Sequence, residues 1–100
     1  EIRGDKFAIG GRQRTAATAF ASHTLPYRPG CRLYLSTDGY ADQFGGPQRQ
    51  KFLQKRFLEL LSALAATPFA GHRAALEAAF DDWRSGARQL DDVLVVGVAF

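Results

Sequence analysis

The sequence predicts an α+β fold in which two helices cover an antiparallel β-sheet. Residues 31–37 alternate apolar and polar side chains, as a strand with two different faces does. Two later stretches, 47–67 and 68–86, carry apolar residues at helical spacing. Residues 93–100 form a continuous apolar run rich in valine, which predicts a central strand buried on both faces. Strands followed by two helices and a last strand favour helices layered on one face of the sheet.

The length and composition limit the number of domains and the kinds of site that this chain can contain. The chain has 100 residues, enough for one domain at most, and 46% of them are hydrophobic, which is typical of a globular protein. It contains no methionine, so we expect a processed product or a fragment that starts at Glu1. The single cysteine, Cys31, excludes an internal disulfide and a cysteine-based zinc site; we expect it to pack as a small apolar residue. No signal peptide or membrane-spanning run is present, so a cytoplasmic setting is expected.

The N-terminal third predicts two further strands. One is a short strand within residues 2–9, ended by a glycine pair and a polar loop. The other is residues 16–27, where small polar and apolar side chains alternate. Pro29-Gly30 is a turn signal, so residues 16–27 and 31–37 are predicted to be hairpin partners.

The two helices are predicted from proline and glycine signals at their ends. Pro47 suits the first position of a helix that should end near Thr67. Thr67 and Pro68 then serve as N-cap and first residue of the second helix, and Gly86 as its C-cap. We expect both apolar stripes to pack against the sheet. Their members are Leu53, Phe57, Leu60, Leu61 and Leu64 in the first, and Phe69, Leu76, Phe80 and Trp83 in the second.

Acidic residues stand at the ends of two predicted strands. Asp38 follows residues 31–37 with Gly39 behind it, and Asp91 and Asp92 precede the last strand. If these strands are antiparallel neighbours, Asp38 and Asp91 meet at one edge of the sheet. Two close carboxylates repel unless they share a cation or a proton, and oxygen-only ligands favour Mg²⁺ or Mn²⁺ over zinc. The pattern alone also allows an ordinary turn and an ordinary strand start.

The remaining polar candidates favour structural roles. His23 is a lone histidine on a predicted strand, and His72 is expected to be exposed near the start of the second helix. Asp81 and Asp82 are read as a solvated pair. The basic residues of the predicted first helix are expected on its solvated face; they are Arg49, Lys51, Lys55 and Arg56. The net charge of +3 does not by itself imply a nucleic-acid partner, and no aromatic residues are placed for base stacking.

Several motifs in order resemble one family. They are Leu33-Tyr-Leu-Ser-Thr-Asp-Gly-Tyr-Ala-Asp-Gln-Phe-Gly-Gly46, Lys51-Phe52, Phe80-Asp-Asp-Trp83, Gln89-Leu-Asp-Asp-Val-Leu-Val-Val-Gly97 and Asp5-Lys-Phe-Ala-Ile-Gly-Gly-Arg-Gln13. Together they resemble the C-terminal part of bacterial metal-dependent serine/threonine phosphatases, the protein phosphatase 2C-like enzymes of the sporulation protein IIE branch. The resemblance implies that residues 1–100 are the C-terminal portion of a four-layer αββα sandwich.

The resemblance also implies a mechanism and a site. The family holds two Mn²⁺ or Mg²⁺ ions, and a metal-bound water attacks phosphoserine or phosphothreonine. The motifs carry the ligand role onto Asp38 and Asp91, with Gly39 and Asp92 as possible secondary residues. The family's other ligands lie in an upstream Gly-Asp and Asp-Gly-His-Gly type region that this sequence lacks. We therefore expect the N-terminal half of the domain to be missing and the chain alone to be inactive.

The family setting predicts partners. Such phosphatases are output modules of bacterial signal transduction, including two-component systems, with a sensor or receiver domain upstream. Their usual substrate is a phosphorylated regulator such as an anti-sigma-factor antagonist. No nucleic acid and no membrane contact are expected of this segment. The alternative is a catalytically dead phosphatase-like module for interaction or dimerisation.

Overall fold

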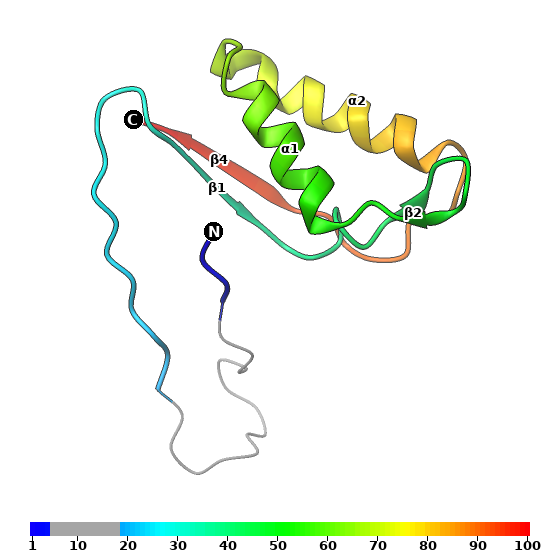
Figure 1. The fold of residues 1–100 in the computed structure, drawn as a ribbon, viewed down its shortest axis with the longest axis horizontal. Helices are drawn as coiled ribbons and strands as arrows, with labels where there is room; N and C mark the ends of the chain where they lie inside the picture. Colours follow the sequence, from blue (N-terminus) through cyan, green and yellow to red (C-terminus); the bar gives the residue numbers. More distant parts are fainter. Residues whose placement is uncertain (5–18) are drawn as a thin grey trace.

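The computed structural model describes residues 1–4 and 19–100, and it confirms the predicted fold class. Antiparallel strands lie beside two helices (Figure 1). The elements in order are β1 (Arg32–Ser36), β2 (Phe44–Gly45), β3 (Gln50–Lys51), α1 (Gln54–Leu64), the 3₁₀ turn η1 (Phe69–Gly71), α2 (His72–Arg84) and β4 (Val95–Ala99). In this part of the chain, no helix is long and apolar enough to cross a membrane.

The central pairing joins β1 to β4, which are far apart in the sequence. The two strands are antiparallel, with Leu33 opposite Val98 in the register. The ladder continues past the end of β1, where the Thr37 N–H donates to the Leu94 carbonyl at 3.0 Å. The neighbouring strands that the acidic motifs require are therefore present.

The predicted hairpin between residues 16–27 and β1 is wrong. Residues 19–27, the described part of that segment, form no strand and run apart from the helices (Figure 1). The turn at Pro29-Gly30 does form, but the Gly30 N–H donates to the Phe100 carbonyl at 2.8 Å. The apolar chain end thus pairs with β1, because its valines match the leucines of β1 better than small polar side chains do. The predicted features within residues 5–18 lie outside the described residues.

The first helix begins later than predicted, because a second hairpin precedes it. Residues 46–49 form the turn between β2 and β3, with the Arg49 N–H donating to the Gly46 carbonyl at 3.2 Å. Gly46 has a φ of 71°, a left-handed conformation that glycine adopts at little cost. Pro47 therefore serves a turn instead of a helix start. Arg49 and Lys51 accordingly lie on the hairpin and not on the solvated face of a helix.

The second helix also differs from the prediction at both ends. The Thr67 hydroxyl donates to the Leu64 carbonyl at 2.8 Å, so this residue closes α1 and does not cap α2. The 3₁₀ turn η1 separates Pro68 from α2. At the other end Ser85 takes the left-handed cap position, and Gly86 follows it with a φ of 85°. Threonine-proline pairs fit either role, and the local hydrogen bonds decide between them.

The core is an aromatic and leucine cluster between the helices and the segment after β1. It confirms that the two stripes pack inward, except for Leu53, which precedes α1 and is 50% exposed. Its buried members are Tyr40, Phe52, Phe57, Leu64, Leu76 and Phe80. Trp83 closes one side of this cluster: its indole N–H donates to the Gln43 carbonyl at 2.9 Å, and the Arg56 guanidinium lies 4.8 Å from its ring centre.

His72 is buried, so the prediction of an exposed histidine is wrong. Its side chain is 3% exposed at the start of α2. Nδ1 shares a hydrogen bond with the Tyr34 hydroxyl, and Nε2 lies 3.2 Å from the Thr67 carbonyl oxygen. The ring therefore joins the first turn of α2 to β1. Cys31 was predicted to pack as a small apolar residue, and this prediction is wrong because the residue is exposed.

Arg32 of β1 completes the C-terminal end of α1. Its Nη1 donates to the carbonyls of Leu64, Ala65 and Thr67 at 3.4, 3.1 and 3.0 Å. The last carbonyls of a helix lack partners within it and carry partial negative charge. A guanidinium at this position satisfies them and fixes the helix to the strand.

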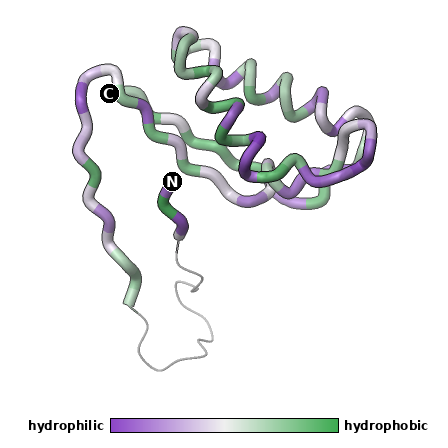
Figure 2. Tube along the Cα trace, in the orientation of Figure 1, coloured by the Kyte–Doolittle hydropathy of each residue, from purple (hydrophilic) through white to green (hydrophobic). Residues whose placement is uncertain are grey.

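The β1–β4 pair has one covered and one exposed apolar face. The face bearing Arg32, Tyr34 and Val95 lies against the helices. The opposite face is 36–58% exposed, and hydrophobic residues colour much of both strands in Figure 2. Its members are Leu33, Leu35, Leu94, Val96 and Val98. The prediction that the last strand is central and buried on both faces is therefore wrong: within the described residues β4 pairs with β1 alone.

We expect Arg32→Gln to lower the free energy of unfolding by about 1.5–3 kcal/mol, the range for hydrogen bonds to a charged group. The substitution removes the guanidinium from the end of α1. Urea denaturation followed by tryptophan fluorescence measures the change. Arg73→Gln is the matched control, because it removes an exposed ion pair with Glu77 and should change stability by less than about 0.5 kcal/mol. Equal effects of the two substitutions would contradict the role of Arg32.

Candidate metal-binding edge of the sheet

Asp38 is an exposed carboxylate on a buried loop. It lies two residues beyond β1, and the chain turns there because the Asp42 N–H donates to the Asp38 carbonyl at 2.9 Å. The side chains that follow are buried, with Tyr40 3% and Gln43 1% exposed. Packing of this loop therefore fixes the position from which the Asp38 carboxylate reaches solvent.

The other acidic segment lies directly against this turn. A Cβ built on Gly39 would lie 2.2 Å from the Asp92 carbonyl oxygen, so only glycine fits there. The Thr37 hydroxyl donates to the same carbonyl at 3.1 Å and accepts from the Leu94 N–H at 3.1 Å. Asp38–Gly39 and Asp91–Asp92 thus meet at one edge of the sheet. Their assignment as metal ligands stays a prediction.

The Asp91–Asp92 segment is held by its own local hydrogen bonds. The Asp91 Oδ1 accepts from the Asp92 N–H at 2.8 Å, and the Gln89 amide donates to the Asp91 carbonyl at 2.9 Å. Both carboxylates belong to exposed residues. The bonds shape the entrance to β4. Among residues 1–4 and 19–100, no hydrogen bond or ion pair involves the other Asp91 oxygen or the Asp92 carboxylate.

Two buried polar side chains of this loop were not singled out from the sequence. The Gln43 amide donates to the carbonyls of Phe44 and Arg88, both at 2.9 Å, and so joins the loop to the chain after α2. The Tyr40 hydroxyl donates to the Leu76 carbonyl of α2 at 2.6 Å. One feature of the sequence could have pointed to them. Both lie between Asp38 and the glycine pair Gly45-Gly46, directly after the end of a predicted strand.

The Tyr40 hydroxyl is a permanent donor at neutral pH. Burial raises the pKa of Tyr40 to about 12, and the negative charge of Asp81 adds to this rise. The neutral phenol therefore keeps its proton for the Leu76 carbonyl throughout the physiological range.

The acids at this edge are of the chemical type that binds a hard cation, but too few of the described ones lie together to form a complete site. Asp38, Asp91 and Asp92 offer the oxygen ligands that Mg²⁺ and Mn²⁺ prefer. Among residues 1–4 and 19–100, no group of three or more His, Cys, Asp or Glu side chains is placed to hold a metal ion. Such ions need near-complete oxygen shells, so a site at this edge would have to be completed by water or by ligands outside the described residues.

The other polar candidates do not join this edge. Asp42 forms an ion pair with Lys51 of β3, with 3.5 Å between the charged atoms. Asp81 and Asp82 are exposed on α2, as expected, and Asp81 lies 3.6 Å from the Arg84 guanidinium. His23 is exposed on the segment before β1.

We expect Gly39→Ala to destabilise the protein by about 2 kcal/mol or more, since the added methyl must displace backbone. Thermal denaturation measures the loss, and the amide resonances of residues 37–39 and 91–94 should shift. Gly71→Ala is the control: it has nothing within 4 Å of the added carbon and a helical conformation. A Gly39→Ala protein as stable as Gly71→Ala would contradict the close approach of the two segments.

Comparisons with known proteins agree with the motifs. The sequence model of the family "Stage II sporulation protein E (SpoIIE)" matches residues 5–100. Among solved structures, the chain is similar to the SiaA-PP2C domain of Pseudomonas aeruginosa, with 30% sequence identity and a TM-score of 0.77. That match covers 83% of this chain and 34% of the SiaA chain, so this chain spans about a third of its length. No curated protein matches significantly. The chain thus belongs to the stage II sporulation protein E family of bacterial protein phosphatase 2C-like domains.

Proposed function

We propose that this chain forms the C-terminal part of a phosphatase domain that uses Mn²⁺ or Mg²⁺ to hydrolyse phosphoserine or phosphothreonine on a protein. The observation that carries the proposal is the meeting of Asp38–Gly39 with Asp91–Asp92 at one sheet edge, in a member of this family. These are the positions onto which the family's ligand motifs fall.

The residues of this edge have distinct roles in the proposed chemistry. Asp38 and Asp91 would hold the metal through carboxylate oxygens, and Asp92 would assist from the next position. Gly39 allows the two segments to approach, because any larger residue meets the Asp92 carbonyl. A bound Mn²⁺ or Mg²⁺ supplies the Lewis acidity that activates water and neutralises developing charge in phosphoryl transfer.

The exposed face of the β1–β4 pair supports a larger domain around this chain. Five aliphatic residues lie together on it, and exposed apolar patches of this kind mark surfaces that other protein packs against. We propose that a second sheet, from the N-terminal half of the domain, covers it in the αββα sandwich and brings the missing ligands. The chain alone should therefore lack phosphatase activity.

The proposed biological setting is bacterial signalling. An upstream sensor or receiver domain would control the phosphatase, and the substrate would be a phosphorylated regulator such as an anti-sigma-factor antagonist. Family membership supports this setting, and phosphatase assays with candidate regulators would test it.

The same exposed face favours a second candidate function. A phosphatase-like module without catalysis could use Leu33, Leu35 and the opposing valines to bind another protein or a second copy of itself. The two functions differ in whether hydrolysis depends on the acids at the sheet edge.

We expect Asp38→Asn and Asp91→Asn, made in the protein that carries this chain, each to reduce Mn²⁺-dependent phosphate release by at least about 100-fold. The loss follows from removing a charged metal ligand. Release from a phosphoserine peptide and from p-nitrophenyl phosphate measures it, and Asp82→Asn on the exposed side of α2 is the control. Full activity in either variant would contradict the ligand role of that aspartate. Hydrolysis of p-nitrophenyl phosphate by the isolated 100-residue chain would contradict the proposal that further ligands lie outside it.

We expect the isolated chain to self-associate through its exposed sheet face. The pair Leu35→Lys and Val96→Lys, which lie opposite each other, should make it monomeric in sedimentation velocity. In the complete protein the same pair should abolish activity, because buried lysines prevent the sheets from packing. Leu58→Lys, on an exposed position of α1, is the control. A fully active complete protein with both lysines would contradict the packing of a second sheet on this face.

A further inference from the structure

The β2–β3 hairpin and the start of α1 carry exposed positive charge that the proposed chemistry does not use. Residues 43–58 contain four cationic side chains and no acidic one. Arg49 lies in the hairpin turn, Lys51 on β3 and Lys55 in the first turn of α1, and all three are exposed. These three residues are called the basic surface below.

The basic surface is joined directly to the loop that carries Asp38. The Leu53 N–H donates to the Ala41 carbonyl at 2.7 Å. The Lys51 ammonium lies 3.5 Å from the Asp42 carboxylate, and the Asp42 N–H donates to the Asp38 carbonyl at 2.9 Å. The positive charge of β3 therefore lies beside the turn from which the Asp38 carboxylate reaches solvent.

The hairpin is held in place by Trp83 and Arg56. A Cβ built on Gly45 would lie 2.0 Å from the Trp83 carbonyl oxygen, and the Gly46 N–H donates to the same carbonyl at 2.9 Å. The Arg56 guanidinium donates to the Lys51 carbonyl at 3.2 Å and lies over the Trp83 ring. A surface that is already ordered loses little entropy when it binds a partner.

Arg49 has a backbone conformation that an arginine does not favour. Its φ is 48°, in the left-handed region that glycine adopts more readily. Within residues 1–4 and 19–100, its side chain forms no hydrogen bond or ion pair. Leu53, with a φ of 77° and a side chain 50% exposed, repeats this combination. Neither the turn nor packing therefore explains Arg49, and residues held in such conformations cluster at ligand-binding sites.

We propose that the basic surface binds acidic side chains that flank the phosphorylated residue of the protein substrate. The proposal rests on the proposed function, which places the phosphoryl group at the sheet edge that carries Asp38. Lys51 can exchange Asp42 for a substrate carboxylate, because an exposed ion pair contributes little. Leu53 offers an apolar contact between the charges. The surface thus selects phosphoproteins with acidic sequence beside the phosphorylation site.

A peptide fits this surface better than a nucleic acid does. A nucleic acid carries a negative phosphate at every position along its backbone. Such a row of charges would also run past the exposed carboxylates of Asp38, Asp91 and Asp92, which repel it. A peptide carries negative charge only where its side chains place it, so it can match positive charge on the hairpin without meeting the acidic edge.

The test uses the protein that carries this chain and two phosphoserine peptides that differ only in their flanking residues, glutamates in one and glutamines in the other. We expect Arg49→Gln combined with Lys51→Gln to raise KM for the glutamate peptide by about fivefold to twentyfold, the effect of losing two charge contacts. The value of kcat should stay within about twofold, and so should both constants for the glutamine peptide and for p-nitrophenyl phosphate.

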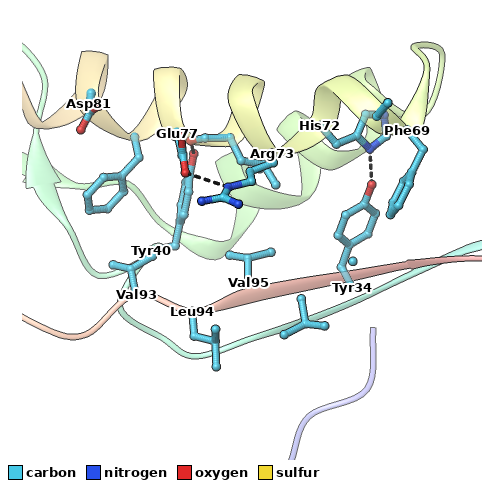
Figure 3. A pocket seen from close by; sticks show the side chains of 15 residues that line it. Tyr34, Tyr40, Phe69, His72, Arg73, Glu77, Asp81, Val93, Leu94 and Val95 are labelled. Atoms are coloured by element: carbon cyan, nitrogen blue, oxygen red, sulfur yellow. Dashed lines mark hydrogen bonds and ion pairs between the residues drawn. The ribbon is translucent and has the colours of Figure 1, made fainter.

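Arg28→Gln combined with Arg73→Gln is the matched control, because it removes the same charge from exposed positions. Arg28 precedes β1, at the end of the strand away from Asp38. Arg73 pairs with Glu77 at the cleft of about 760 Å³ between α2 and β4 (Figure 3). It lies about 15 Å along α2 from Trp83, which packs against the hairpin. The control should leave every KM unchanged.

Arg49→Gly separates binding from folding. Glycine accepts a φ of 48° without steric cost, so the melting temperature should equal or exceed that of the wild type. KM for the glutamate peptide should still rise by about twofold to fivefold, because one cation is lost. An unchanged KM would overturn the role of Arg49 in binding, whatever the melting temperature.

A second readout needs neither metal nor hydrolysis. In EDTA, fluorescence anisotropy of the labelled glutamate peptide should show binding that weakens with added salt and in the Arg49→Gln, Lys51→Gln variant. The Arg28→Gln, Arg73→Gln control should bind as the wild type does.

The two proposals fail on different results. Equal KM increases for both peptides, equal losses of binding in both double variants, or no change in Arg49→Gln, Lys51→Gln overturn the role of the basic surface. Tighter binding of a single-stranded oligonucleotide of equal charge, also lost in that variant, overturns the choice of a protein partner. A wild-type protein without Mn²⁺-stimulated hydrolysis overturns the proposed function, and the anisotropy measurement then decides on the basic surface alone.

Discussion

The antiparallel pairing of β1 with β4 is the constraint on which the rest of the structure depends. It joins residues 59 to 67 positions apart, from Ser36 opposite Val95 to Arg32 opposite Ala99. Because one strand ends where the other begins, the pairing places both acidic motifs at one edge. The same register points Arg32 and Tyr34 toward the helices, where they fix the end of α1 and the start of α2. One ladder thus orders the acidic edge and the helical layer together.

The loop after Asp38 links the sheet to the helical layer. Tyr40 reaches α2, and Gln43 reaches the chain beyond α2 while its carbonyl accepts from Trp83. A surface carboxylate would otherwise sit on a mobile turn. Here buried neighbours on both sides hold the turn, which is the support that a metal ligand needs.

The sequence predicted the fold class from strong, local patterns, and it predicted the meeting of the acidic motifs on the condition that their two strands are antiparallel neighbours. Alternation in 31–37, the valine run after Asp92 and the helical stripes each identify one element. It did not predict the partner of β1, the β2–β3 hairpin or the burial of His72. Pro29-Gly30 and Gly46-Pro47 mark turns without saying which segments follow, and only tertiary hydrogen bonds make that choice. Tyr40 was missed for a similar reason, since its partner is a backbone carbonyl.

The long separation of β1 from β4 also bears on the order of folding. The aromatic cluster joins residues 40–83, so it can assemble from contacts that are closer in sequence. β1 has no strand partner among the described residues until both helices and β4 have been synthesised. Non-local pairing of this kind is slow and leaves an apolar strand open to wrong partners during synthesis. The acidic edge is therefore among the last parts of the chain to form, and a ribosome-bound intermediate with its helices in place would still lack it.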